Sequence, residues 1–258
     1  MKFDVVFPKN VGQRYFNTHF QYVLNIFKDL DSKIKEEERD GFVVTINGQS
    51  FLFDYADTDI PVVCNIPVFK FHCKYESERV SSFPPVSFLN WADYRDFRNL
   101  CQYKAKGSIN MRQRFYGNAT ERRNTARNIL INKFPGLNIA QVSQKEFWLE
   151  INNCFLPVFV PGWCNNMLDR GQFQYMALGC CTISPRLPEC LPFGKKLIPN
   201  EHYIQCKDDY SDLIDLIKFY ECFRETCIEI GNNAKQLFEI TSTPEAIGNW
   251  IGDRLWRL

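Results

Sequence analysis

The sequence predicts an α/β protein made of two halves, and three observations support this prediction. Its 258 residues are enough for one or two domains of ordinary size. Hydrophobic residues make up 45% of the chain and charged residues 24%, a balance typical of a chain that buries a full core. From Lys104 onward, short apolar runs alternate with helical patterns, which indicates right-handed βαβ units around a parallel sheet.

Short strands are expected to dominate the first half. A strand over residues 2–7 leads into a helix over 15–30, whose apolar residues recur at helical spacing. Asn47-Gly48 between two apolar runs is a hairpin signal. The mixed-charge run 33–40 is expected to be a solvated helix end. The other expected elements are strands over 41–46, 51–54, 62–65 and 68–73 and a helix over 91–101.

In the second half, strands and helices are expected to alternate. Ser143 and Glu146 have the spacing of a capping box at a helix start. A long helical region is expected over 211–240, with a break at Gly231. The other expected elements are strands over 108–115, 137–142, 157–160, 180–184 and 202–205 and helices over 120–133, 144–152 and 169–178.

Thr243-Pro244 predicts the start of a last helix, because an N-cap residue is followed by proline at the first helical position. The expected division of the chain is therefore residues 1–100, residues 101–242, and a C-terminal helix over 243–258 that packs back on the first half.

Composition narrows the class of function. A formal net charge of +1, with no basic face, argues against nucleic acid as the main ligand. No stretch reaches the roughly 20 apolar residues of a membrane span, and the first residues do not resemble a signal peptide. The 11 cysteines contain no C-x-x-C pair, so we expect reduced thiols in a cytoplasmic protein.

The segment 159–185 is the first candidate site. A strand runs into a loop rich in Pro and Gly that contains Trp163, and a helix then opens with Asp169-Arg170. Free N–H groups, the helix dipole and the guanidinium fork of Arg170 all suit a phosphate group. The alternative is an ordinary βαβ unit in which Arg170 pairs with Asp169 or another surface acid.

The segment 111–127 is the second candidate site. Arg112 and Arg114 share one face of an expected strand, and Asn118 lies in the following turn. Arg122 and Arg123 fall near the start of the next helix, where positive charge opposes the helix dipole unless an anion is bound. A solvated basic helix face is the alternative. Because both segments follow parallel strands, we expect these arginines to face one crevice and clamp a diphosphate.

In their order and spacing, these motifs resemble the donor-binding domain of GT-B glycosyltransferases, especially the exostosin-like families. Residues 115–117 (F-Y-G) followed by Arg122 and Arg123 are similar to that family's F-x-G and Arg pattern. The segment 170–181 is similar to its Arg-led helix that ends in a Gly-Cys step. The resemblance covers about residues 104–217 and extends to the xylosyltransferases of large algal viruses, the chloroviruses.

The resemblance implies two Rossmann-like halves of the GT-B type, with the acceptor bound by the first and the nucleotide-sugar donor by the second. It implies transfer of a sugar, xylose in the narrower match, from a UDP-linked donor to a glycan hydroxyl, with inversion and without a metal. Gln174 would bind the donor ribose, at a position where the family often has Glu. The first half would supply the general base, for which we favour Asp57. The alternatives for the base are Asp54, Asp59, His19 and His72.

Two other interpretations stay open. Asp57-Thr58-Asp59 is a D-x-D triplet, which a metal-dependent GT-A-like transferase would use to hold a divalent cation on the diphosphate. No cofactor is expected if arginines neutralise the phosphates instead. The chain is alternatively a noncatalytic protein that binds a sugar or a nucleotide on the same scaffold.

Overall fold

The computed structural model describes most of the chain. The described residues are 1–9, 14–38, 42–55, 64–84, 91–113, 117, 119–134, 137, 139–162, 168, 170–187 and 190–257, with the backbone alone for 14–20. The chain divides into two compact units. Unit 1 comprises Met1–Leu89, Glu189–Lys196 and Glu239–Leu258, and unit 2 comprises Asn90–Pro188 and Leu197–Phe238.

Unit 1 contains a six-stranded mixed sheet in the order β2-β1-β3-β4-β5-β6. Its strands are β1 (Asp4–Pro8), β2 (Lys33–Glu37), β3 (Val43–Ile46), β4 (Gln49–Asp54), β5 (Val68–Lys70) and β6 (Val80–Ser82). β1 pairs with β2 in parallel, as do β4 with β5 and β5 with β6, whereas β3 is antiparallel to both of its neighbours. A short hairpin of β10 (Cys190–Leu191) and β11 (Lys195–Lys196) also belongs to this unit.

The predicted hairpin at Asn47-Gly48 is confirmed. Both residues have positive φ, 49° and 84°, as a two-residue hairpin turn requires, and Ile46 pairs with Gln49 across it. Asn47 also holds the turn against β1, because Asp4 N donates to Asn47 Oδ1 at 2.9 Å and Asn47 N donates to Asp4 O at 2.8 Å. The Asn47-Gly48 turn thus sets the register in which β4 pairs with β3.

The charged run after the first helix is not the helix end that its composition suggested. Residues 33–37 form β2, which lies at one edge of the sheet and pairs in register with β1 from Asp4↔Lys33 to Pro8↔Glu37. An edge strand is a common place for charged residues, because they discourage pairing with another chain. Residues 33–37 form a strand because they pair with β1, and a run of mixed charges does not reveal such pairing.

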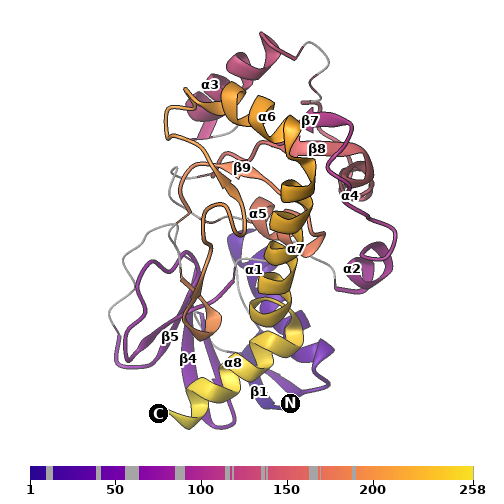
Figure 1. Ribbon diagram of the computed structural model, residues 1–258. Coiled ribbons are helices and arrows are strands. Elements are labelled where there is room, and N and C mark those ends of the chain that lie inside the picture. The colour runs from indigo at the N-terminus through magenta and orange to yellow at the C-terminus, as the bar shows by residue number, and fades with distance from the viewer. Residues whose placement is uncertain are drawn as a thin grey trace. The chain divides into compact units, whose positions relative to one another are not determined.

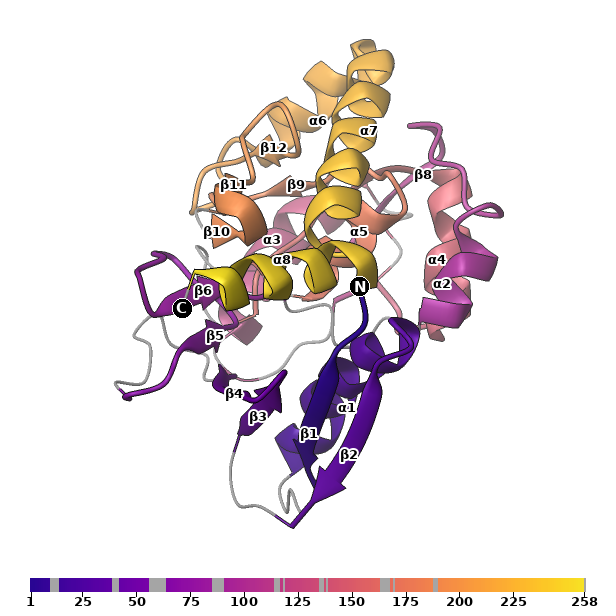
Figure 2. The ribbon, with the colours of Figure 1, turned by 90° about the horizontal axis from the view of Figure 1, so that it is seen from below.

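Two long helices complete unit 1: α1 (Arg14–Asp29), which lies behind β1 and β2 in Figure 2, and α8 (Pro244–Trp256). α8 begins as predicted, with the Thr243 side chain accepting from Ala246 N at 3.2 Å and proline at the first position. Trp250 Nε1 in α8 donates to the Ser82 carbonyl at 3.0 Å, which ties the helix to the end of β6.

The described residues of unit 2 form four short parallel strands, and a parallel sheet is what the alternating pattern predicted. They are β7 (Ser108–Asn110), β8 (Cys154–Pro157), β9 (Ile183–Ser184) and β12 (Ile204–Gln205). β7 pairs with β8 and β9 pairs with β12, while a parallel bridge between Val158 and Ile183 joins the two pairs. The parallel order is therefore β7-β8-β9-β12.

Six helices of the described residues accompany these strands. They are α2 (Trp91–Phe97), α3 (Ala119–Ile131), α4 (Gln144–Glu150), α5 (Arg170–Ala177), α6 (Leu213–Cys222) and α7 (Arg224–Thr241), the last of which runs on into unit 1. Figure 1 shows β8 and β9 between α3 and α6 above and α5 below. One core joins Leu130 of α3 and Ile217 of α6 to Val158 beside β8. The α/β class predicted from the sequence is confirmed, whereas two Rossmann-like halves stay a prediction.

Three local predictions in unit 2 have different outcomes. The capping box at the start of α4 is confirmed, since Glu146 N donates to Ser143 Oγ and Ser143 N donates to the Glu146 carboxylate. The helix break expected at Gly231 occurs at Phe223 instead. The described residues of 137–142 form no strand, and the carbonyl of Ala140 accepts a hydrogen bond from Arg112.

Among the described residues, no helix has the length and apolar character needed to cross a membrane.

Candidate functional site

Polar side chains gather where the four parallel strands of unit 2 end. β7 ends at Asn110, β8 at Pro157, β9 at Ser184 and β12 at Gln205. Ligands of open parallel sheets bind outside this carboxyl edge, because loops from neighbouring strands meet there. Both arginine-bearing segments that the sequence singled out lead away from this edge.

Two arginines at the start of α3 hold the segment that follows β8. Arg123 is buried and donates from Nε and Nη2 to the carbonyl of Val160, at 3.2 and 3.1 Å. Gln113 binds the same residue, with Nε2 donating to Val160 O at 2.7 Å and Oε1 accepting from Val160 N at 2.6 Å. Nη2 of Arg122 donates to the carbonyls of residues 161–162, at 3.3 and 3.2 Å. Side chains therefore hold residues 160–162 and place two guanidinium groups beside them.

The loop after β12 also reaches the two arginines. Burial raises the pKa of Tyr210, and the Cys206 thiol raises it further, whereas the positive charges of Arg122 and Arg123 act in the opposite direction. Such an influence weakens with distance, so Tyr210 lies near both guanidinium groups. Loops that follow β7, β8 and β12 thus converge on the start of α3.

A buried pair of side chains holds the first turn of α5 against the start of β9. Gln172 and Thr182 are fully buried and exchange two hydrogen bonds: Gln172 Nε2 donates to Thr182 Oγ1 at 3.0 Å, and Thr182 Oγ1 donates to Gln172 Oε1 at 3.1 Å. Arg170, the first residue of the helix, is exposed. The positive end of the α5 dipole and the Arg170 charge therefore lie at the far end of the loop whose beginning Arg122 contacts.

Ser184 adds a hydroxyl group at the end of β9. It is fully buried, and its Oγ has no hydrogen-bond partner among the described residues. Buried hydroxyl groups are nearly always paired in folded proteins, so an unpaired one calls for an explanation. Because the side chain is fully buried, this hydroxyl is not open to a ligand from solvent.

Arg112 is engaged by a carboxylate of its own unit. Its side chain is only 3% exposed and forms a two-pronged ion pair with Glu150, with Nε donating to Oε2 at 2.9 Å and Nη2 paired with Oε1. Nη1 donates to the Ala140 carbonyl at 2.6 Å. Arginine binds a phosphate with the same two-pronged geometry, but here the anion is the Glu150 carboxylate at the end of α4.

The carbonyl oxygen of Gln174 is likewise engaged by α4. Gln174 Oε1 accepts from Trp148 Nε1 at 2.7 Å and from the Gln144 side chain. Phe147 and Tyr175 add an edge-to-face ring contact, at 5.3 Å between centroids, between the same two helices. Gln174 therefore joins α4 to α5 in this structure, and its role toward a ribose stays a prediction.

Unit 1 contains a buried ion pair at the carboxyl ends of β4 and β5. Lys70 Nζ lies 3.2 Å from Asp54 Oδ2, and the two residues face each other in the register of the strands. The Asp54 side chain is 4% exposed, so an acceptor hydroxyl has no direct access to it. His72, another alternative base, follows β5 with a positive φ of 56° and is half-buried.

Several predicted site residues lie outside the described residues. They are Asp57, Asp59, Arg114, Asn118, Trp163 and Asp169. For His19, only the backbone is described, within α1. Among the described residues, no group of three or more His, Cys, Asp or Glu side chains is arranged to hold a metal ion.

Sequence reasoning missed the residues that build the loop rather than carry charge. Gln113 lies between Arg112 and Arg114, and Gln172 lies two residues after Arg170. In both places the prediction rested on the charged arginines and not on the neutral glutamine. Ser184 ends a predicted strand and precedes a proline, which is the one sequence signal that places it at the edge. As a whole, the arrangement offers cationic groups and a helix N-terminus to an anionic ligand.

No protein-family model matches the chain, and no curated protein is similar to it in sequence.

Proposed function

We propose that the protein is a glycosyltransferase that takes its sugar from a nucleotide diphosphate donor bound at the carboxyl edge of the unit 2 strands. UDP-linked xylose is the proposed donor, and a glycan hydroxyl is the proposed acceptor. The two Rossmann-like halves of the GT-B type belong to the same proposal. The resemblance of the motifs motivates the class of reaction, and the geometry supports the position of the donor.

One observation carries the proposal. Arg122 contacts the carbonyls at the beginning of the loop after β8, and Arg170 opens α5 at the end of that loop. Positive charge thus brackets a loop at the edge where parallel sheets bind ligands. A diphosphate is an anion that suits such a loop, since helix N-termini and guanidinium groups both favour phosphate oxygens.

The proposed chemistry uses these charges in the transition state. The acceptor oxygen forms a bond to the anomeric carbon while the bond from that carbon to the diphosphate oxygen breaks. The nucleoside diphosphate leaves with added negative charge, which fixed positive groups stabilise more in the transition state than in the ground state. The proton of the acceptor hydroxyl passes to a general base, for which Asp57 remains our proposal.

Calorimetry on the full chain tests the donor site. UDP and UDP-xylose are titrated in excess chelator, with UDP-glucose and GDP-mannose for comparison. We expect UDP-xylose to bind, and Arg122→Ala to weaken that binding at least tenfold. Arg98→Ala is the matched control, because Arg98 is an exposed arginine of unit 2 beyond the end of α2. Equal affinity in the parent and Arg122→Ala would contradict the donor site.

A second measurement separates a transferase from a noncatalytic binder. Hydrolysis of the bound donor without acceptor is followed by release of free sugar, because a transferase leaks some donor to water. Asp57→Asn should bind donor like the parent protein but fail to transfer. If activity is lost in chelator and restored by manganese, the metal-dependent interpretation through Asp57 and Asp59 replaces this one.

A further inference from the structure

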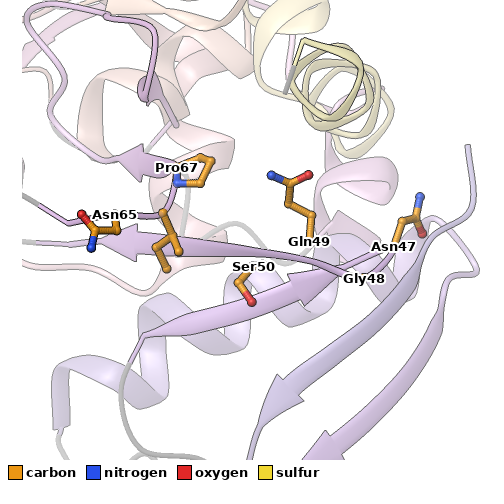
Figure 3. Close-up of a pocket in the computed structure, with 7 residues that line it drawn as sticks. Asn47, Gly48, Gln49, Ser50, Asn65 and Pro67 are labelled. Atoms are coloured by element: carbon orange, nitrogen blue, oxygen red, sulfur yellow. The ribbon is translucent and has the colours of Figure 1, made fainter.

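A hollow lies in unit 1 at the end of the sheet where β4 and β5 begin. It has a volume of about 540 Å³ and is formed by the Asn47-Gly48 hairpin, the first residues of β4 and the segment that enters β5. This volume falls within the roughly 300–1,000 Å³ of small-molecule sites. Figure 3 shows its lining residues, with Gln49 and Pro67 reaching to one side of β4 and Ser50 to the other.

The hollow lies away from the Asp54–Lys70 pair. Gln49 begins β4 and Asp54 ends it, so five residue steps of about 3.3 Å place the two roughly 16 Å apart. The residues that line the hollow therefore contact neither the ion pair nor the carboxyl edge of this sheet.

The lining is polar but carries no charge. Three of its residues have amide side chains, namely Asn47, Gln49 and Asn65, whereas the Ser50 hydroxyl points to the other side of β4 and lies 3.3 Å from Thr45 Oγ1. No hydrogen bond joins the side chains of Gln49 and Asn65 to any other described residue. An amide presents both donors and an acceptor, so Gln49 and Asn65 can each bind a hydroxyl group in either sense. The Asn47 Oδ1 already accepts from Asp4 N, which leaves its amide N–H groups as donors. The absence of a cation in the lining argues against a phosphate ligand.

The framework around these amides is held firmly. Asp4 N donates to the Asn47 side-chain oxygen and Asp4 O accepts from Asn47 N, which fixes the turn. On the other side, Leu52 N donates to the Pro67 carbonyl at 2.9 Å. β4 pairs with β3 and β5, so the hollow offers no free strand edge to which an extended peptide could add. Ile66 and Pro67 supply an apolar wall. Neutral hydroxyl groups and an apolar C–H face together describe a carbohydrate.

We propose that this hollow, which we call the amide hollow (Asn47, Gly48, Gln49, Ser50, Asn65, Ile66 and Pro67), binds a neutral oligosaccharide. The site would hold a glycan chain in unit 1, at the end of the sheet opposite the Asp54–Lys70 pair. It rests on the lining alone and does not depend on the donor site in unit 2.

Nuclear magnetic resonance on the full chain tests the proposal without nucleotide present. Side-chain amide signals of Asn47, Gln49 and Asn65 are followed while xylotetraose, cellotetraose or mannotetraose is added, with tetraethylene glycol as a probe that lacks the ring hydroxyls. We expect at least one tetrasaccharide to shift these signals in a saturable manner, and tetraethylene glycol to leave them unchanged. No shift with any of the three sugars at 20-fold molar excess over millimolar protein, or an equal shift with tetraethylene glycol, would overturn the proposal.

A variant and its control sharpen the result. Gln49→Ala combined with Asn65→Ala should weaken the binding at least tenfold, while Asn132→Ala, an exposed amide in unit 2, should leave it unchanged. The double variant should keep the parent's affinity for UDP-xylose, so that a failed sugar site and a failed donor site give different results. Sugar binding that survives unchanged in the double variant would overturn the assignment to the amide hollow.

Discussion

Lys70 Nζ and Asp54 Oδ2 are 3.2 Å apart, and their side chains are 1% and 4% exposed. Two opposite charges are thus taken out of water side by side, at the ends of adjacent parallel strands. Burial of either charge is tolerated only because the other is beside it, and removing one leaves an uncompensated charge in the core. Asp54 therefore acts as the counter-ion of a buried lysine, and this role separates it from Asp57 three residues later.

Removing one member of this pair should destabilise the protein strongly. Lys70→Met leaves the Asp54 carboxylate buried without its cation and should lower the free energy of unfolding by about 3–5 kcal/mol. Asp54→Leu together with Lys70→Met should recover most of that loss, because no buried charge remains. Urea unfolding of the single and double variants measures both effects, and a loss under about 1 kcal/mol for Lys70→Met would contradict this account.

Replacing Arg170 should weaken donor binding and turnover but change the free energy of unfolding little. Its replacement by Ala removes a charge-assisted contact worth about 1.5–3 kcal/mol, which corresponds to roughly a 10- to 150-fold loss of kcat/KM. Lys should restore only part of the activity, because it keeps the charge but loses the planar fork. The comparison uses Arg98→Ala as before, and unchanged donor affinity and turnover in Arg170→Ala would show that the site lies elsewhere.

Glu150 should contribute to stability and little to donor binding. Glu150→Ala leaves the Arg112 guanidinium, whose side chain is 3% exposed, without its carboxylate, and should lower the free energy of unfolding by about 1.5–3 kcal/mol. Donor affinity measured by calorimetry should stay at the parent value. A marked gain in affinity for UDP would instead indicate that Glu150 competes with a phosphate for Arg112.

His202 should make unit 2 less stable below neutral pH. Ile198 N donates to His202 Nδ1 at 3.0 Å, so that nitrogen must be unprotonated. Burial lowers the pKa of His202 from 6.5, although the charge of Glu201 opposes the shift. Because the folded pKa lies below the unfolded value, this stabilisation is present above about pH 6.5 and is lost as pH falls through the folded pKa.

The measurement is the free energy of unfolding between pH 7.5 and 5.0 for the parent and for His202→Gln. The variant should show a shallower loss on acidification, since it has no imidazole to protonate at this position. The difference between the two curves removes the contribution of the other histidines. Curves that stay parallel over this range would rule out His202 as the cause.

Gly231 should tolerate no side chain, although it lies in a helix. A Cβ at this position would lie 2.1 Å from the carbonyl oxygen of Gly179, and backbone atoms cannot move aside cheaply. Gly231→Ala should therefore destabilise the protein by about 1–3 kcal/mol or more. Gly252→Ala in α8 is the control, because its Cβ would meet only the flexible Met1 side chain, and alanine favours a helix by about 1 kcal/mol. Equal thermal midpoints for the two variants would contradict the close approach.

The parts of the fold that followed from sequence are those with a local chemical cause. Asn47-Gly48 specifies its turn through positive φ, Ser143 and Glu146 cap each other, and Thr243 caps the last helix. Each signal lies within a few residues of the structure that it determines. The parallel direction of the unit 2 strands followed from the alternation of strands and helices along the chain.

The parts that did not follow depend on residues far apart in the chain. β2 is a strand because β1 pairs with it, and Gly231 lies inside α7, where its lack of a side chain leaves room for the Gly179 carbonyl. At the candidate site, the arginines were identified but their partners were not. Arg112 meets Glu150 at a separation of 38 residues, and Arg123 meets Val160 at 37. No pattern in a single sequence reveals such pairs.

The discontinuous path of unit 1 has a consequence for synthesis. Its sheet is made from the first 89 residues, but α8, whose Trp250 caps the end of β6, emerges from the ribosome only after the whole of unit 2. At a translation rate of roughly 5–20 residues per second, the sheet waits several seconds with the surface that α8 covers still exposed. We therefore expect unit 2 to complete its folding before unit 1, although synthesis begins with unit 1. During that interval the incomplete sheet of unit 1 would be a substrate for chaperones.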